Sequence, residues 1–200
     1  ANSCRFASGD SAYMHFTPSA GGDQKTFTVS FWVKMGKLGV TKNLFSYAES
    51  AGSNPRGFMG FIDTSSGYED RLAIATNPTA SAWHYPLNFS SKAFYDPSAW
   101  YHLVMMMDTT QSTEADRFKL YINGIEYDET VAVSSPSYPD EDADTGWNSE
   151  FKHSIGVKED TDSMFFDGYI AEFIMCEGTA YAASDFGEFD SDSPGIWKPK

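Results

Sequence analysis

The stretch from residue 97 to residue 128 constrains the fold more than any other part of the chain. Its first apolar run, Tyr101–Met107, is too short for an independent helix and is bounded by turn residues, which is typical of a strand. Its second run, Phe118–Asn123, alternates apolar and polar side chains. Asn123-Gly124 then predicts a type I′ turn, since both central residues of that turn need a positive φ. We therefore expect an antiparallel meander here.

Period-two alternation recurs along the rest of the chain. The clearest case is Phe27–Met35, in which every second residue is apolar. Turn-rich segments separate about a dozen such runs, and this spacing predicts an all-β fold, a two-sheet antiparallel β-sandwich. The other strands are expected at residues 3–6, 12–16, 44–48, 57–62, 71–76, 152–157 and 163–177, with 83–85 as an edge strand or an ordered loop. We expect one domain over residues 1–200, with residues 189–200 as a strap anchored by Trp197 and Ser184 capping a single turn before it.

Two side chains break the alternation. Trp32 falls on the polar face of its strand, where it is either a contact platform or is covered by a loop or a neighbouring strand. Glu172 falls between Ile170 and Ile174 on an apolar face. Either a partner satisfies its carboxylate or a β-bulge turns the side chain away, and the pattern favours the bulge.

The charge of the chain limits its partners. With 28 acidic and 14 basic residues the formal net charge is −14, which opposes binding to nucleic acid and to anionic membrane surfaces. No apolar run approaches the roughly 18 residues of a membrane helix, so we expect no membrane insertion. Cys4 and Cys176 could form a disulfide if the terminal segments lie side by side, although two free thiols are the favoured interpretation.

Several motifs together resemble a known superfamily. Trp100–Val104, followed after a loop by Lys119–Gly124, resembles the central hairpins of the concanavalin A-like, laminin-G-like jelly rolls. The wider order of motifs resembles lectin-like domains in virion proteins of tailed bacteriophages, often tail or fibre components. These motifs are Phe6–Asp10, Asp96–Trp100, Asp108–Gln111, Asp116-Arg117, Phe166–Tyr169, Ser184–Glu188 and Trp197–Lys200. The resemblance implies a concanavalin A-like jelly roll in a virion, made in the host cytoplasm.

The sequence does not favour an enzyme. Glycosidases of this fold resemble one another in a Glu-x-Asp-x-x-Glu motif, which sets two carboxylates on one strand face. Glu114-Ala-Asp116 and Glu188-Phe-Asp190 both fail to complete that motif, and the four histidines are scattered. We therefore expect no catalytic residues.

A calcium site is the alternative that the acidic loops leave open. Asp140, Asp142 and Asp144 resemble the start of a calcium loop, since oxygens at alternate positions can surround a hard cation. The glycine and the final glutamate of such a loop are out of place, so a solvated acidic loop is the default interpretation. Asp160 and Asp162 form a second acidic loop of the same kind. We expect no other cofactor.

Glycan binding through the loops is the remaining hypothesis. Sugar rings stack their C–H faces on aromatic side chains, and their hydroxyls need polar partners. The loops are rich in both, although loop aromatics also plug the ends of sandwiches or pack against other subunits. The residues expected to contact a ligand are Tyr68, Trp83, Tyr85, Asn88, Tyr138 and Trp147.

The functional prediction is a non-enzymatic virion domain that displays loops for attachment to a host-surface glycan or protein. One alternative is a purely structural decoration or fibre domain whose partners are other virion proteins, with a homo-oligomer left open. A glycoside hydrolase of the same fold is the third alternative, and the absent carboxylate motif counts against it.

Overall fold

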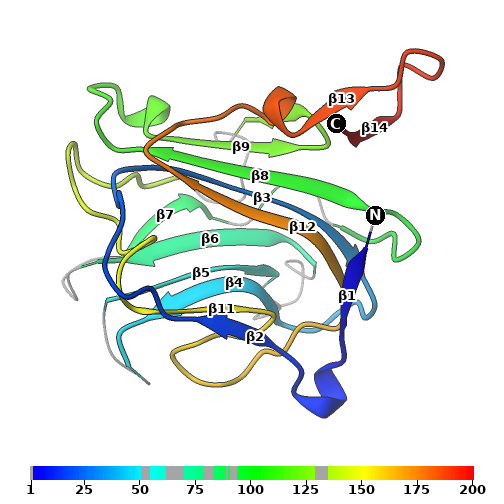
Figure 1. The fold of residues 1–200 in the computed structure, drawn as a ribbon, viewed down its shortest axis with the longest axis horizontal. Helices are drawn as coiled ribbons and strands as arrows, with labels where there is room; N and C mark the ends of the chain where they lie inside the picture. Colours follow the sequence, from blue (N-terminus) through cyan, green and yellow to red (C-terminus); the bar gives the residue numbers. More distant parts are fainter. Residues whose placement is uncertain are drawn as a thin grey trace.

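A computed structural model describes residues 2–50, 55–61, 70–78, 83–88, 90, 94–128 and 135–200. In these residues two six-stranded antiparallel sheets lie face to face, and a separate two-stranded hairpin lies beside one of them (Figure 1). The predicted all-β, two-sheet sandwich is therefore confirmed. Within the same residues, no helix is both long enough and apolar enough to cross a membrane.

The two sheets are formed by strands from both halves of the chain. Sheet A has the order β1 (Ser3–Phe6), β12 (Gly168–Glu177), β3 (Thr26–Met35), β8 (Tyr101–Asp108), β9 (Phe118–Ile122) and β10 (Ile125–Tyr127). Sheet B has the order β2 (Met14–Phe16), β11 (Lys152–Ile155), β4 (Lys42–Ala48), β5 (Arg56–Phe61), β6 (Leu72–Asn77) and β7 (His84–Leu87). The hairpin pairs β13 (Gly187–Phe189) with β14 (Trp197–Pro199). Short 3-10 turns lie at η1 (Ser8–Asp10), η2 (Glu114–Asp116) and η4 (Ala183–Asp185).

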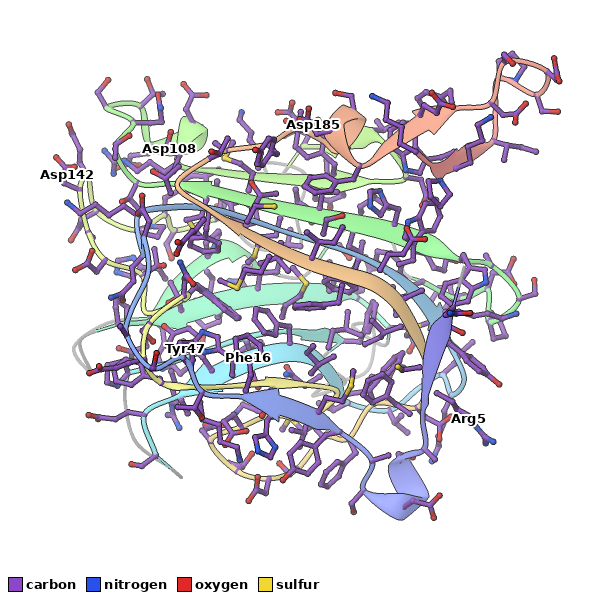
Figure 2. All side chains as sticks on the ribbon, viewed as in Figure 1. Arg5, Phe16, Tyr47, Asp108, Asp142 and Asp185 are labelled. Carbon is purple, nitrogen blue, oxygen red and sulfur yellow. The ribbon has the colours of Figure 1, made fainter. Side chains whose placement is uncertain are left out.

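The core lies between the sheets and follows from the alternation in the sequence. On β3, the side chains from Phe27 to Met35 at every second position are almost fully buried against sheet B. Leu103, Met105 and Met107 on β8 join them, as does Tyr47 from sheet B, which Figure 2 labels. Burial raises the pKa of the Tyr47 hydroxyl, which donates a hydrogen bond to the carbonyl of Thr145 over 2.6 Å.

The opposite face of β3 is also covered, by the C-terminal segment of the chain. The hydroxyl of Thr28 donates to the carbonyl of Thr179 over 3.0 Å and accepts from the backbone N–H of Tyr181 over 2.9 Å. Farther along, Trp32 retains only 9% of its surface exposed. The interpretation of Trp32 as a side chain covered by a neighbouring strand is therefore confirmed, since its ring stacks on His102 of the adjacent strand β8.

Two local predictions are confirmed by backbone geometry. Asn123 and Gly124 have φ values of 50° and 79°, and they join β9 to β10 with Ile122 paired to Ile125. On β12 the register with β3 shifts between Ala171 and Ile174, which places a bulge at Glu172. The bulge turns the Glu172 side chain to solvent. It also holds the Glu172 backbone in the left-handed region, with a φ of 52°, which is unfavourable for a non-glycine residue.

Other expectations were less accurate. The final long strand begins at Gly168 and not at Ser163, because residues 158–163 close a turn through a bridge between Lys158 and Ser163. The C-terminal strap is not a single extended segment, since its ends pair as β13 and β14. The expected cap is also different, because the Asp185 carboxylate, and not Ser184, accepts the hydrogen bond from the Ala182 N–H.

The remaining predicted strands lie within one or two residues of their expected places where they are described. The exceptions are residues 12–13, which precede β2, and residue 62, which lies outside the described residues. Residues 84 and 85 become part of the edge strand β7, in which Pro86 is tolerated because none of the described strands pairs with its far side. Cys4 and Cys176 are free thiols.

Candidate functional site

The predicted ligand-binding side chains that the structure describes do not form one cluster. Trp83 and Tyr85 lie together on sheet B, with ring centroids 5.8 Å apart, and both are half-buried. Asn88 directly follows β7 and is also half-buried. Tyr138 packs against the main core, and Tyr68 lies outside the described residues.

The predicted role of Trp147 in ligand contact needs correction. Its side chain is fully buried in the main core, stacked on Phe45 at 5.0 Å and edge-on to Tyr47 at 4.7 Å. A side chain with no exposed surface has no face to offer a sugar, so its predicted role in ligand contact is wrong. It follows the alternative that the sequence left open, in which a loop aromatic plugs the end of the sandwich.

A calcium site at Asp140, Asp142 and Asp144 stays a prediction, and the structure places these side chains in a solvated acidic loop. All three side chains are described and exposed, and Asp142 lies at the periphery of the molecule, 3.6 Å from the amine of Lys25 (Figure 2). No three acidic, histidine or cysteine side chains among the described residues gather into a cluster that could hold a metal ion. In the second acidic loop, Asp160 is buried in ion pairs instead.

A hollow lies elsewhere, on the outer face of sheet A beside the C-terminal hairpin. Three tryptophans define it, and we call it the tryptophan groove: Trp32 from β3, Trp100 from the residue before β8, and Trp197 from β14. Segments far apart in the sequence meet here, because the hairpin lies against the ends of β8 and β9 (Figure 1).

A buried histidine fixes two of the three tryptophans. Trp32 and His102 are cross-strand partners on β3 and β8, and their rings stack with centroids 4.7 Å apart. The indole N–H of Trp197 donates to His102 Nδ1 over 2.9 Å. Because an indole N–H can only donate, Nδ1 accepts and the proton of the imidazole is on Nε2, which donates to the Ser30 hydroxyl over 2.9 Å. Burial lowers the pKa of His102 to about 4, so the ring is neutral at physiological pH.

Two glycines leave room for the Trp197 ring, Gly124 on sheet A and Gly187 within the hairpin itself. A Cβ added at Gly124 would lie about 2.3 Å from the Trp197 ring, and one added at Gly187 would lie 2.6 Å from it. Phe189 packs edge-on to the same indole at 4.9 Å, and Lys198 binds Asp190 over 3.0 Å within the hairpin. The turn that closes β9 and β10 therefore also provides the surface on which the hairpin rests.

The groove consists of two adjoining hollows that share the three tryptophans. The smaller has a volume of about 380 Å³ and the larger about 600 Å³. The other residues of the smaller hollow are Asn2, Ser3, Ala171, Glu172, Lys198 and Pro199. Those of the larger hollow are Phe94, Tyr101, Ile122, Asn123, Ile125, Phe189, Gly195 and Ile196. Aromatic faces thus form the floor and walls, with polar side chains among them.

Glu172 places a carboxylate at the smaller hollow. The bulge in β12 turns this side chain outward, and its left-handed backbone is one that non-glycine residues adopt at a cost. Lys198 lines the same hollow from the hairpin, so the smaller hollow contains both an anionic and a cationic group. An uncharged ligand with both hydrogen-bond donors and acceptors would suit this pair.

The sequence did not reveal this groove as a site, although one residue in it gave a signal. Trp32 on the polar face of its strand was recognised as a potential contact platform. Trp100 and Trp197 appeared only as parts of motifs, because no pattern shows that residues 32, 100 and 197 meet. Their meeting depends on how the C-terminal hairpin folds back over sheet A.

The chain resembles solved structures in fold. One is domain 4 of AbnA, an extracellular arabinanase from Geobacillus stearothermophilus, in complex with arabinotriose; it is 19% identical with a TM-score of 0.52, covering 85% of this chain and 77% of that one. The CBM40 of a Ruminococcus gnavus sialidase, bound to α2,3-sialyllactose, is 12% identical with a TM-score of 0.50, covering 86% and 94%. Domains LG4-5 of mouse laminin α1 are 10% identical with a TM-score of 0.59, covering 89% and 42%.

These identities are low, and the structural matches establish the fold alone. No curated protein matches the sequence. Residues 8–179, however, match the family profile described as the concanavalin A-like lectin/glucanases superfamily. With most of the chain matched and the two-sheet sandwich in place, the protein belongs to the concanavalin A-like lectin/glucanase superfamily.

Proposed function

We propose that the protein is a non-catalytic carbohydrate-binding domain and that the tryptophan groove is its binding surface. The observation that carries this proposal is the convergence of Trp32, Trp100 and Trp197 on a hollow that also presents polar side chains. Indole faces pack well against the C–H faces of sugar rings, and hydroxyl groups need donors and acceptors at the margin. The groove offers both, in a rigid setting.

The electrostatics favour a neutral glycan. The whole chain carries a formal charge of −14, and Glu172 is the one acidic side chain among the residues that line the groove. An anionic sugar would approach against this field, whereas a neutral oligosaccharide would not. The combined hollow has room for a short oligosaccharide, since ligand pockets typically measure about 300–1,000 Å³.

The proposal that the domain is not an enzyme rests on the same lining residues. Hydrolysis of a glycoside generally needs two carboxyl groups, roughly 5–5.5 Å apart in retaining enzymes and further apart in inverting ones. Glu172 has no second carboxylate beside it among the lining residues of either hollow. Two structural neighbours, the arabinanase domain with arabinotriose and the CBM40 with sialyllactose, support sugar binding on this fold.

The test is a glycan array followed by calorimetry on the best neutral ligand. Trp100→Ala removes a partly exposed indole (36% exposed), so the fold should survive. We expect the affinity to fall about tenfold, which corresponds to one well-packed aromatic contact. Tyr13→Ala is the matched control, since Tyr13 is 38% exposed and lies outside the groove, beside the sheet-B edge strand β2. Equal affinity in both variants, or no glycan bound by the unmodified protein, would contradict the proposal.

Protein docking is a second candidate function, favoured by the exposed side chains at the larger hollow. Ile125 and Ile196 are 64% and 58% exposed, and Phe189 lies beside them. Exposed apolar side chains that gather in one place are typical of protein-interaction surfaces. This function suits the alternative of a structural domain. The virion setting and its partner proteins remain a prediction from the sequence motifs, and co-purification with the particles of a phage that encodes the chain would test it.

A further inference from the structure

A second aromatic surface lies on the outer face of the other sheet. We call it the arginine–tryptophan patch and define it by Arg56 and Phe58 on β5, Asn77 on β6, Trp83 before β7 and Tyr85 on β7. It is on sheet B, across the sandwich from the tryptophan groove. The inference about this patch therefore does not rest on the function proposed for the groove.

The apolar part of the patch is a two-ring platform. Trp83 and Tyr85 are tilted by 30° from each other, and Phe58 supports Trp83 with ring centroids 6.0 Å apart. The neighbouring outward side chains on β6 are Ala73 and Ala75, which are small and buried. The two half-exposed rings therefore form a surface for the flat face of a small ligand.

The charged part of the patch has an excess of positive charge. The guanidinium of Arg56 lies 5.2 Å from the Trp83 ring centroid and donates to the Asp160 carboxylate over 2.6 Å. Lys158 binds the same carboxylate over 2.7 Å. Asp160 is buried, so two cations share one buried anion. In a chain with a net charge of −14, this is a local site suited to an anion.

Two polar atoms of the patch have no hydrogen-bond partner within the part of the chain that the structure describes. Arg56 Nε and Asn77 Oδ1 are both buried, and neither makes a hydrogen bond. Arg56 and Asn77 are direct cross-strand partners at the ends of β5 and β6, so their side chains are neighbours on one face of the sheet. An unfilled donor beside an unfilled acceptor is costly in a folded protein and suggests that a ligand supplies the missing groups.

We infer that the arginine–tryptophan patch binds an acidic sugar of the hexuronate class. A carboxylate is the acceptor that a guanidinium edge recognises best, and the exposed part of Arg56 can bind one carried by a sugar ring. The C–H face of the same ring would lie on Trp83 and Tyr85. Arg56 retains a quarter of its side-chain surface exposed, which gives a carboxylate access from solvent. The two faces of the sandwich would then select different glycans, a neutral one at the groove and an acidic one at the patch.

The experiment is a calorimetric titration with a trigalacturonate, using the neutral trigalactose and inorganic phosphate as comparison probes. We expect the uronate alone to bind, more weakly as salt is raised. Arg56→Lys keeps the charge beside Asp160 but removes the planar donor edge, so the fold should persist while uronate affinity falls about tenfold. Trp83→Ala should weaken uronate binding to a similar degree.

Trp100→Ala is the matched control, because it alters the groove and leaves the patch untouched. It should not change uronate affinity. The inference would be overturned if the uronate did not bind, or if inorganic phosphate bound equally well. It would also be overturned if the folded variants Arg56→Lys and Trp83→Ala kept the full uronate affinity. Loss of uronate binding in Trp100→Ala alone would place the acidic sugar in the groove and equally contradict it. None of these results bears on whether a neutral glycan binds the groove.

Discussion

Acidification should destabilise this domain through two buried histidines. His102 accepts from the Trp197 indole and donates to Ser30, while His153 accepts from the Asn148 N–H and donates from Nδ1 to the Phe151 carbonyl. Burial lowers the pKa of each to about 4. Each imidazole therefore needs its neutral form in the folded state, because one nitrogen of each accepts a hydrogen bond.

The sign and the size follow from linkage. In the unfolded chain a histidine has a pKa near 6.5, so below that pH the unfolded state binds more protons than the folded state, and stability falls as the pH falls. The stabilisation is complete above about pH 6.5 and is lost progressively down to about pH 4. At pH 5 the loss is about 2 kcal/mol for each histidine, or about 4 kcal/mol for both. That is a large part of the roughly 5–15 kcal/mol that stabilises a typical domain.

The assay is urea unfolding followed by tryptophan fluorescence at pH 7.5 and pH 5.0. Replacing one histidine by glutamine should halve the difference in unfolding free energy between the two pH values, and replacing both should nearly abolish it. The absolute stability of each variant does not matter, because the pH dependence is the readout. An unchanged difference in the double variant would refute the reasoning, as would equal stability of the unmodified protein at both pH values.

Three further predictions follow from single contacts. Asp70→Asn should lower the unfolding free energy by about 3–5 kcal/mol, because the fully buried Lys42 amine loses the carboxylate that lies 2.6 Å from it. Chemical denaturation measures this loss, and a value under about 1 kcal/mol would contradict the prediction. Gly124→Ala should lower the unfolding free energy by at least about 1 kcal/mol and expose Trp197 to solvent, because the added Cβ would clash with that indole. Iodide quenching of tryptophan fluorescence measures the exposure, and unchanged quenching would count against the described position of the hairpin. Glu172→Gly should raise the unfolding free energy by up to about 1 kcal/mol by relieving the left-handed backbone, and a melting temperature below that of the unmodified protein would oppose this view of the bulge.

Most of the fold could be predicted because its causes are local. Alternation over Phe27–Met35 gives a strand with one buried face, and Asn123-Gly124 supplies the positive φ values of the turn. The bulge at Glu172 was predictable for the same reason, since strict alternation would have buried a carboxylate. In each case the information lies within about ten residues.

The site could not be predicted in the same way, because its causes are distant in the sequence. The β13–β14 hairpin brings Trp197 to His102 across 95 positions, and nothing near either residue signals the contact. Trp147, a loop aromatic, looked available to a ligand for the same reason, since its burial depends on Phe45 and Tyr47 of the distant strand β4. Of the predicted ligand residues, Trp83 and Tyr85 do pair with each other, and these two are close neighbours in the sequence.

The central claim, that a neutral glycan binds between the hairpin and sheet A, can be tested by NMR of the five indole N–H groups. In protein labelled with ¹⁵N at tryptophan, adding the best neutral glycan should shift the signals of Trp32, Trp100 and Trp197. The signal of Trp147, buried in the core, should remain in place as an internal reference. A titration that shifts only Trp83, or no indole at all, would contradict the account.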